Sequence, residues 1–283
     1  MSSSVNPQTK PHPLADLSGT ILLAGAGKMG GAMLEGWLAL GLAAKNLAVI
    51  EPQPSREIAA LSARGLRLNP SRDAVGDVAA VVVAVKPQVA DEVMPTLAPF
   101  VGGATVVVSI MAGRTMRFLA TSLPSAAIVR AMPNTPAAIG RGITVAVANA
   151  RVSDAQRALV DALLSAVGAV EWVADEALMD AVTALSGSGP AYVFLLAETM
   201  AQAGAAAGLP PALAATLARA TVAGAGELLH RSPLDAATLR QNVTSPGGTT
   251  AAALDVLMAK DGLAPLMRMA IAAATARSRE LAG

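Results

Sequence analysis

Glycines near the N-terminus have the spacing of a phosphate-binding turn. The stretch reads Gly25-Ala26-Gly27-Lys28-Met29-Gly30. It follows an apolar run and opens an amphipathic helix that ends near Gly41. In this context glycines allow a tight turn, a close approach of a pyrophosphate and close helix–strand packing, and the helix start offers free N–H groups. A strand–helix turn without a ligand is the alternative.

The end of the next apolar run carries the residues that would choose between two nicotinamide cofactors. Glu51 stands where an acidic residue commonly binds the ribose hydroxyls, which favours NADH. Ser55 and Arg56 follow within reach of a 2′-phosphate, which favours NADPH, although Arg56 could equally be a solvated charge. The prediction is NADPH or NADH, with a slight preference for NADPH.

Three further loops follow apolar runs and are expected to line one crevice, because ligands of open α/β sheets lie outside the carboxyl ends of the strands. Val85 and Lys86 stand in the first loop and Ala112 in the second. Asn134 lies between two prolines in the third, as a side chain held by a rigid loop would. An Asx-type turn is the alternative for Asn134.

A second glycine-rich turn lies far along the chain, before a helical stretch. It reads Val243-Thr244-Ser245-Pro246-Gly247-Gly248-Thr249-Thr250. Glycines expose backbone N–H groups, hydroxyls add donors, and the helix dipole favours an anion, so that a small carboxylate would suit this turn. A plain helix start with threonine as its cap is the competing interpretation.

Apolar β-rich runs alternate with helical stretches through the first part of the chain, which predicts a mostly parallel α/β sheet. Strands are expected at 20–26, 47–51, 66–68, 78–85, 105–111, 127–130, 143–149 and 169–173. Helices are expected at 55–63, 88–97, 115–123 and 153–167, besides the one that follows the first glycine turn.

After residue 175 only helical stretches follow, separated by turns rich in glycine and proline. They are expected at 176–185, 190–207, 210–229, 235–243, 249–260 and 264–281. We therefore predict three parts: a flexible tail over 1–19, a Rossmann-type dinucleotide-binding domain over 20–174, and an all-α substrate and dimerisation domain over 175–283.

Composition excludes several classes of function. Cysteine is absent, which rules out disulfides and thiol nucleophiles. The two histidines, His12 and His230, are too few for a histidine metal site, so no metal is expected. A net charge of +1 with 2% aromatic residues argues against nucleic-acid binding. No apolar window of membrane-spanning length is free of polar interruption, and the N-terminus does not look like a signal peptide, so a cytoplasmic protein is expected.

Taken together, these segments resemble the pyrroline-5-carboxylate reductase family over residues 20–283. The matching segments are GAGKMG at 25–30, AVKPQ at 84–88, RAMPNTPAAIGRGIT at 130–144, LSGSGPAYVF at 185–194 and VTSPGGTTAAAL at 243–254. The last three are much more specific than the glycine motif.

The resemblance implies reduction of L-1-pyrroline-5-carboxylate to L-proline, the last step of proline biosynthesis. By analogy, the backbone of Gly248, Thr249 and Thr250 would hold the substrate carboxylate, and the Thr250 hydroxyl would face the ring nitrogen. Val243, Ser245 and Gly247 would lie alongside, while Val85, Lys86 and Ala112 would lie along the cofactor. Such enzymes form interlocked homodimers, often assembled further into rings.

The residue types that are missing agree with imine reduction. Reducing a carbonyl needs a positioned acid, yet Lys260 is the only lysine and His230 the only histidine of the helical part. A cyclic imine can enter already protonated, so that hydride transfer needs little beyond positioning and a hydrogen-bond partner. The alternatives are a reductase for another small carboxylate or cyclic imine, and a dinucleotide-binding assembly protein without catalysis.

Overall fold

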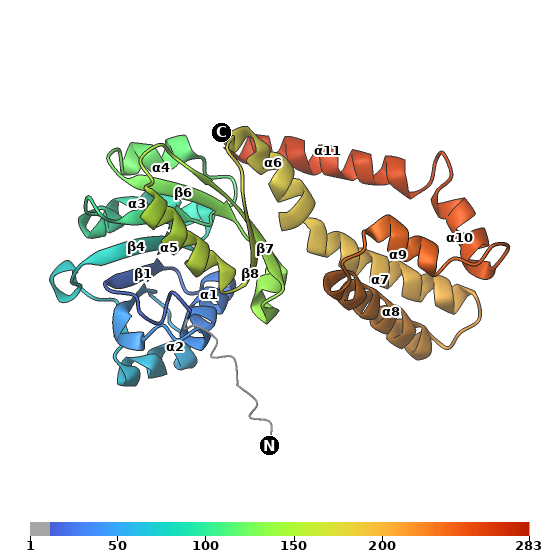
Figure 1. Ribbon diagram of the computed structural model, residues 1–283, viewed down its shortest axis with the longest axis horizontal. Helices are drawn as coiled ribbons and strands as arrows, with labels where there is room; N and C mark the ends of the chain where they lie inside the picture. The colour runs from blue at the N-terminus through green and yellow to red at the C-terminus, as the bar shows by residue number, and fades with distance from the viewer. Residues whose placement is uncertain (1–11, 283) are drawn as a thin grey trace, which may run out of the picture. The chain divides into compact units, whose positions relative to one another are not determined.

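Eight strands form one sheet in the first part of the chain (Figure 1). The computed structural model describes residues 12–282. The strands are β1 (Thr20–Ala24), β2 (Leu47–Ile50), β3 (Arg67–Leu68), β4 (Val78–Val83), β5 (Val106–Ser109), β6 (Ala127–Met132), β7 (Gly142–Ala148) and β8 (Gly168–Trp172). Their order is β3-β2-β1-β4-β5-β6-β7-β8, and only β6 and β7 pair antiparallel. The prediction of a mostly parallel sheet is confirmed.

Helices cover both faces of this sheet, because its strands are apolar on both sides. On one face, α1 (Lys28–Ala39), α2 (Arg56–Ala60) and α5 (Asp154–Ser165) contribute buried side chains to one apolar cluster. On the other face, α3 (Ala90–Leu97) and α4 (Met116–Ser122) do the same. Trp37 is fully buried under α5 and donates a hydrogen bond from its indole to the Leu163 carbonyl at 2.8 Å.

Side-chain caps set several helix starts where the sequence predicts them. The hydroxyls of Ser55, Thr115 and Ser153 accept hydrogen bonds from backbone N–H groups of α2, α4 and α5. Strand ends differ from the prediction by a few residues. β1 ends at Ala24 rather than residue 26, because Gly25 adopts a left-handed φ of +89° that no strand residue has.

The prediction of a flexible tail over residues 1–19 is wrong for residues 12–19; the rest of it lies outside the described residues. Leu14 is 1% exposed and belongs to the apolar cluster that contains α1. The Leu17 carbonyl accepts a hydrogen bond from the Asn46 side chain at 2.7 Å. The stretch is polar overall, and the prediction overlooked its two leucines, Leu14 and Leu17, which both pack against this cluster.

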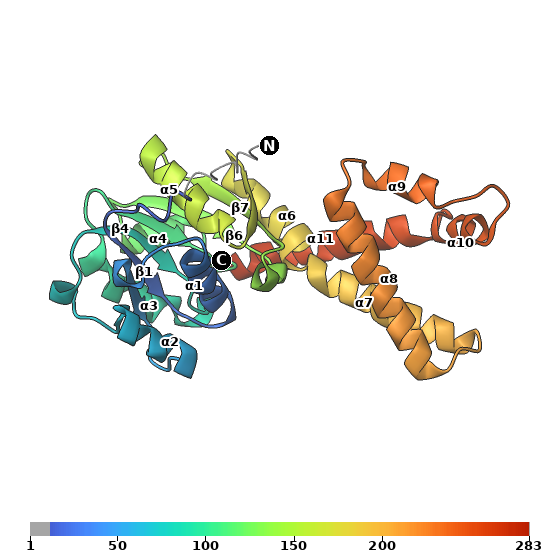
Figure 2. The same ribbon diagram turned by 60° about the horizontal axis from the view of Figure 1, so that its bottom comes forward.

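The chain divides into two compact units, of which the second, residues 188–277, contains helices only. Of the described residues, 12–187 and 278–282 belong to the first unit. The helices of the second part of the chain are α6 (Met179–Val182), α7 (Gly189–Ala206), α8 (Pro211–Arg231), α9 (Ala236–Asn242), α10 (Thr249–Leu257) and α11 (Leu263–Ala282). Within the second unit α7 and α8 pack against each other (Figure 2).

The stretch between residues 175 and 187, which the sequence assigns to the helical domain, packs on the sheet. Met179 is 1% exposed and contacts Val145 and Val147 of β7. One carboxylate oxygen of Glu176 accepts hydrogen bonds from the Arg130 guanidinium and from the Met116 backbone N–H, both at 2.7 Å. These contacts place α6 in the first compact unit. That unit ends at residue 187, which is 13 residues beyond the predicted boundary at residue 174.

Replacing Glu176 by alanine is expected to lower the free energy of unfolding by about 3 kcal/mol, because it leaves the buried Arg130 charge without its carboxylate. Urea unfolding measures this. The matched control is Glu171→Ala on β8, an exposed glutamate whose loss is expected to change stability by less than about 0.5 kcal/mol. Equal midpoints for the two variants would contradict this account of the ion pair.

Candidate functional site

The carboxyl ends of β1, β2, β4 and β5 lie at one edge of the sheet, and three backbone hydrogen bonds extend the pairing beyond the strands there. Gly25 N–H donates to the Ile50 carbonyl at 2.9 Å, Ala84 N–H to Ala24 at 2.7 Å and Ile110 N–H to Val83 at 3.0 Å. The strand order reverses between β1 and β4, which is where open α/β sheets bind their ligand. The loops that the sequence predicts to share one crevice therefore begin at this common edge.

The glycine turn has the shape that a pyrophosphate needs. A Cβ on Gly30 would lie 2.1 Å from the Gly25 carbonyl oxygen, so only glycine permits this approach of α1 to β1. A Cβ on Gly27 would meet nothing within 4 Å, which leaves open space over the turn. Gly27 is the N-cap of α1, no side chain caps the helix, and its first turn holds no acidic residue. The helix start can therefore receive the diphosphate of a dinucleotide.

Glu51 follows β2 directly, and its carboxylate faces the glycine turn. One of its oxygens accepts the Ala26 N–H at 2.9 Å and the other accepts the Gln53 N–H at 3.1 Å. Ser55 caps α2 by accepting the Ile58 N–H at 3.3 Å, and Arg56 stands exposed at the first position of that helix.

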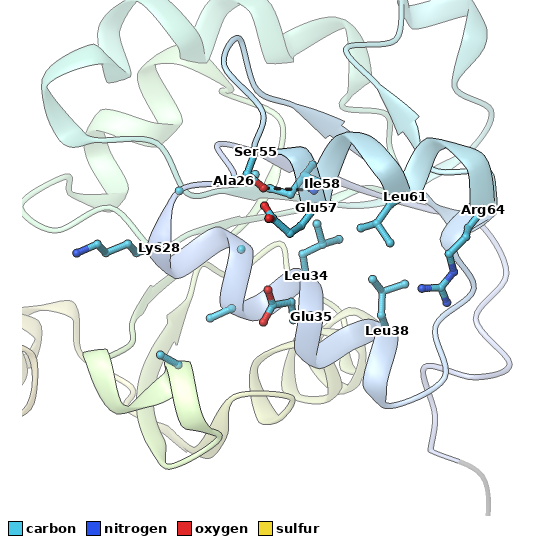
Figure 3. Close-up of a pocket in the computed structure, with 14 residues that line it drawn as sticks. Ala26, Lys28, Leu34, Glu35, Leu38, Ser55, Glu57, Ile58, Leu61 and Arg64 are labelled. Carbon is cyan, nitrogen blue, oxygen red and sulfur yellow. Dashed lines mark hydrogen bonds between the residues drawn. The ribbon is translucent and has the colours of Figure 1, made fainter.

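A cavity of about 570 Å³ opens beside the glycine turn, between α1 and α2 (Figure 3). Glu35 and Glu57 turn toward it, whereas Lys28 points away. A hydrogen bond from the Ser55 hydroxyl holds the pKa of Glu57 below its usual range. Two carboxylates and the Arg64 guanidinium thus line the cavity, so no excess of positive charge prepares it for a phosphate.

Val85 and Lys86 follow β4, and Ala112 follows β5. Arg114, which the sequence analysis missed, joins these two loops. Its guanidinium donates twice to the Pro87 carbonyl, at 3.0 and 2.7 Å, and once to the Asp91 carboxylate at 2.8 Å. It also lies 4.4 Å from the centre of the Phe118 ring. No local sequence pattern predicts this role, because the hydrogen-bond partners of Arg114 lie more than 20 residues away.

Arg114→Ala is expected to weaken dinucleotide binding ~tenfold, since it removes charge-assisted hydrogen bonds that fix both loops. Titration with NADH and with NADPH measures the dissociation constants. Arg117→Ala, in the exposed first turn of α4, is the control and is expected to bind both as the wild type does. An Arg114→Ala variant with unchanged dissociation constants would show that the two loops hold their position without the guanidinium.

Asn134 follows β6, and its side chain is engaged within the protein. Its amide oxygen accepts the Ile143 N–H at 3.0 Å, and its amide nitrogen lies 3.4 Å from the Ser186 hydroxyl. Ser186 belongs to a π-helix over residues 183–187. Asn134 therefore fixes its loop against β7, and its contact with a cofactor stays a prediction.

The predicted substrate residues all belong to the second unit, where they lie between the end of α9 at Val243 and the first turn of α10. Gly248 is the N-cap of this helix and no side chain caps it, so the alternative of a threonine cap is wrong. Gly247 has a left-handed φ of +69°, and Gly248 N–H donates to the Ser245 carbonyl at 3.1 Å. The first turn holds no acidic residue. The leading N–H groups of a helix lack partners within it, so this start can accept a carboxylate.

Comparisons with known proteins identify the family of this chain. Residues 176–281 match the family model "Pyrroline-5-carboxylate reductase dimerisation", and residues 20–113 match "NADP oxidoreductase coenzyme F420-dependent". A pyrroline-5-carboxylate reductase of Synechocystis is 44% identical over 260 residues, which are 89% of this chain and 96% of that protein. The chain belongs to the pyrroline-5-carboxylate reductase family. The predicted resemblance, the fold class and the assignment as an NAD(P)H-dependent reductase are confirmed.

Other pyrroline-5-carboxylate reductases are also similar to this chain in sequence or in structure. The reductase of Pseudomonas aeruginosa is 40% identical over 93% of this chain and 96% of its own. A solved reductase from Coxiella burnetii superposes with a TM-score of 0.86 at 33% identity, covering 94% of this chain and 99% of its own. A Plasmodium falciparum pyrroline carboxylate reductase, solved with NADP bound, has a TM-score of 0.77 at 28% identity, with 94% and 98% covered.

Proposed function

We propose that this chain transfers a hydride from NADPH or NADH to L-1-pyrroline-5-carboxylate and forms L-proline, the last step of proline biosynthesis. The observation that carries the proposal is the uncapped, glycine-led start of α10, in a chain that also holds an uncapped glycine turn at the carboxyl edge of a Rossmann-type sheet. One helix start suits a diphosphate and the other a small carboxylate.

The cofactor supplies the hydride, and the residues of the chain bind and orient. The backbone N–H groups of Thr249 and Thr250 hold the substrate carboxylate, which the helix dipole favours. The Gly248 N–H donates to the Ser245 carbonyl, so Gly248 contributes to the site as the N-cap of α10. The protonated ring N–H donates a hydrogen bond to the Thr250 hydroxyl oxygen, which keeps the electron-poor carbon of the imine toward the nicotinamide. Hydride addition neutralises the iminium, so no protein acid has to deliver a proton during the step.

The other residues predicted to bind the substrate or the cofactor complete the proposed site. Val243, Ser245 and Gly247 form the turn beside the substrate. Along the cofactor we place Gly25, Gly27, Lys28, Met29, Gly30, Glu51, Ser55, Arg56, Val85, Lys86, Ala112 and Asn134.

A second copy of the chain is the proposed partner of the helical unit. Large apolar side chains of α7 and α8 are exposed within one chain, among them Phe194 at 68% and Leu217 at 47%. Among the described residues, α8 is also the one helix long and apolar enough to cross a membrane. The family match of this region to a dimerisation model supports a homodimer that covers these side chains. Further assembly into a ring, a cytoplasmic location and the absence of nucleic-acid or membrane partners stay predictions.

Absorbance loss of NADH and NADPH with pyrroline-5-carboxylate as acceptor tests the proposed function. We expect turnover that depends on the imine, with proline as the product identified by chromatography. Parallel assays offer 2-hydroxy acids with the oxidised cofactors, and other cyclic imines with the reduced ones. Faster turnover of any of those, or cofactor binding without turnover of any substrate, would contradict the proposal.

A further inference from the structure

The Glu51 carboxylate is held in one orientation by backbone groups from two loops. The Ala26 N–H of the glycine turn reaches one oxygen and the Gln53 N–H the other, at 2.9 and 3.1 Å. Each carboxylate oxygen accepts more than one hydrogen bond. The group therefore keeps free acceptor positions beside the glycine turn, and it cannot swing away without giving up two hydrogen bonds.

Asn69 fixes the backbone of Glu51 from both sides. Its amide oxygen accepts the Glu51 N–H at 2.8 Å, and its amide nitrogen donates to the Glu51 carbonyl at 2.9 Å. Its own N–H donates to the Val49 carbonyl at 2.7 Å. Asn69 has a φ of +48°, and no other non-glycine residue in the described part of the chain has a positive φ. Asparagine adopts this conformation more readily than most residues, and here the three hydrogen bonds to Val49 and Glu51 hold it.

Ser55 and Arg56, which would favour NADPH, are less well positioned to bind a cofactor than Glu51 is. The Ser55 hydroxyl already accepts the Ile58 N–H as the cap of α2. Arg56 is exposed, and no hydrogen bond or ion pair within the described residues directs it toward the glycine turn, whereas three residues hold Glu51 there. A 2′-phosphate brought next to the fixed carboxylate would place two anions together, while a 2′-hydroxyl would donate a hydrogen bond to it.

We propose that Glu51, positioned by Asn69, binds the 2′-hydroxyl of the adenosine ribose, so that this enzyme binds NADH in preference to NADPH. The inference rests on the proposed function for the identity of the cofactor class. It reverses the slight preference for NADPH that Ser55 and Arg56 suggested from the sequence.

Dissociation constants for NADH and NADPH, from fluorescence titration without substrate, test this directly. The wild type is expected to bind NADH at least ~tenfold more tightly, the worth of a hydrogen bond to a charged group. Glu51→Gln, which keeps the shape and removes the charge, should bring the ratio of the two constants toward one. Asn69→Ala should shift the ratio in the same direction by a smaller factor. Arg117→Gln, in the exposed first turn of α4, is the control and should leave both dissociation constants unchanged.

A wild type that binds NADPH as tightly as NADH, or more tightly, would overturn the proposal. So would a Glu51→Gln variant that folds and keeps the wild-type ratio. The wild-type ratio needs no variant, so it decides the matter even if a substitution prevents folding. Because the titration contains no imine, its result is independent of whether pyrroline-5-carboxylate is the substrate.

Discussion

Replacing Gly30 by alanine is expected to abolish NAD(P)H binding. The added Cβ would lie 2.1 Å from the Gly25 carbonyl oxygen and 3.2 Å from the Ala84 Cβ, so α1 has to move away from β1. The obstacle is backbone and cannot rotate aside. Overpacking of this kind costs about 1–3 kcal/mol of stability, and the displaced helix start loses its position over the diphosphate. Cofactor titration and thermal unfolding measure both effects.

Gly31→Ala is the matched control for Gly30→Ala, one position further along the same helix. Its Cβ would meet the Ala26 carbonyl oxygen at 3.5 Å, an ordinary van der Waals contact. Alanine is also a better helix former than glycine by about 1 kcal/mol. We expect this variant to bind the cofactor normally and to unfold at the same or a higher temperature. Equal behaviour of the two variants would contradict the role assigned to the Gly30 contact.

Thr250→Ala is expected to lower kcat for imine reduction by roughly 30- to 1000-fold, equivalent to about 2–4 kcal/mol in the barrier, because the ring N–H loses the hydroxyl oxygen that accepts its hydrogen bond and positions it. The first unit is untouched, so the dissociation constants of NADH and NADPH should not change. Steady-state kinetics with pyrroline-5-carboxylate, together with cofactor titration, separate the two effects.

Thr250→Ser restores the hydroxyl and is the control for the loss of the methyl group. It should recover most of the rate that alanine loses. A Thr250→Ala variant with wild-type kcat would remove Thr250 from the catalytic machinery, and equal losses in serine and alanine would assign the effect to packing instead.

Local patterns predict the fold of this chain well, because its elements follow local rules. The glycine motif, the apolar run of β4 and the caps at Ser55, Thr115 and Ser153 each depend on neighbours within a few residues. The pyrroline-5-carboxylate reductase family is also recognisable, because its specific motifs are short and continuous.

Local sequence patterns do not predict contacts between residues that are distant in the sequence. Arg114 donates hydrogen bonds to Pro87 and Asp91, and Glu176 accepts one from Arg130, which is 46 residues away in the sequence. These separations explain why the sequence does not show that the stretch after residue 175 packs on the sheet, and why it missed Arg114. Asn69 had a weak local signal, since asparagine tolerates the left-handed conformation better than most residues, although the proline that follows favours an extended one. Its two hydrogen bonds to Glu51 had no signal in the sequence.

The fate of the transferred hydrogen tests the central claim most directly. The wild-type enzyme would be given NADH or NADPH that carries deuterium at both hydrogen positions of the reactive carbon of the nicotinamide, with pyrroline-5-carboxylate in ordinary water. We predict proline that carries a single deuterium at the ring carbon that was the imine carbon, as mass spectrometry and NMR would show. Unlabelled proline, or no proline while the cofactor stays reduced, would contradict direct hydride transfer to the imine by this chain.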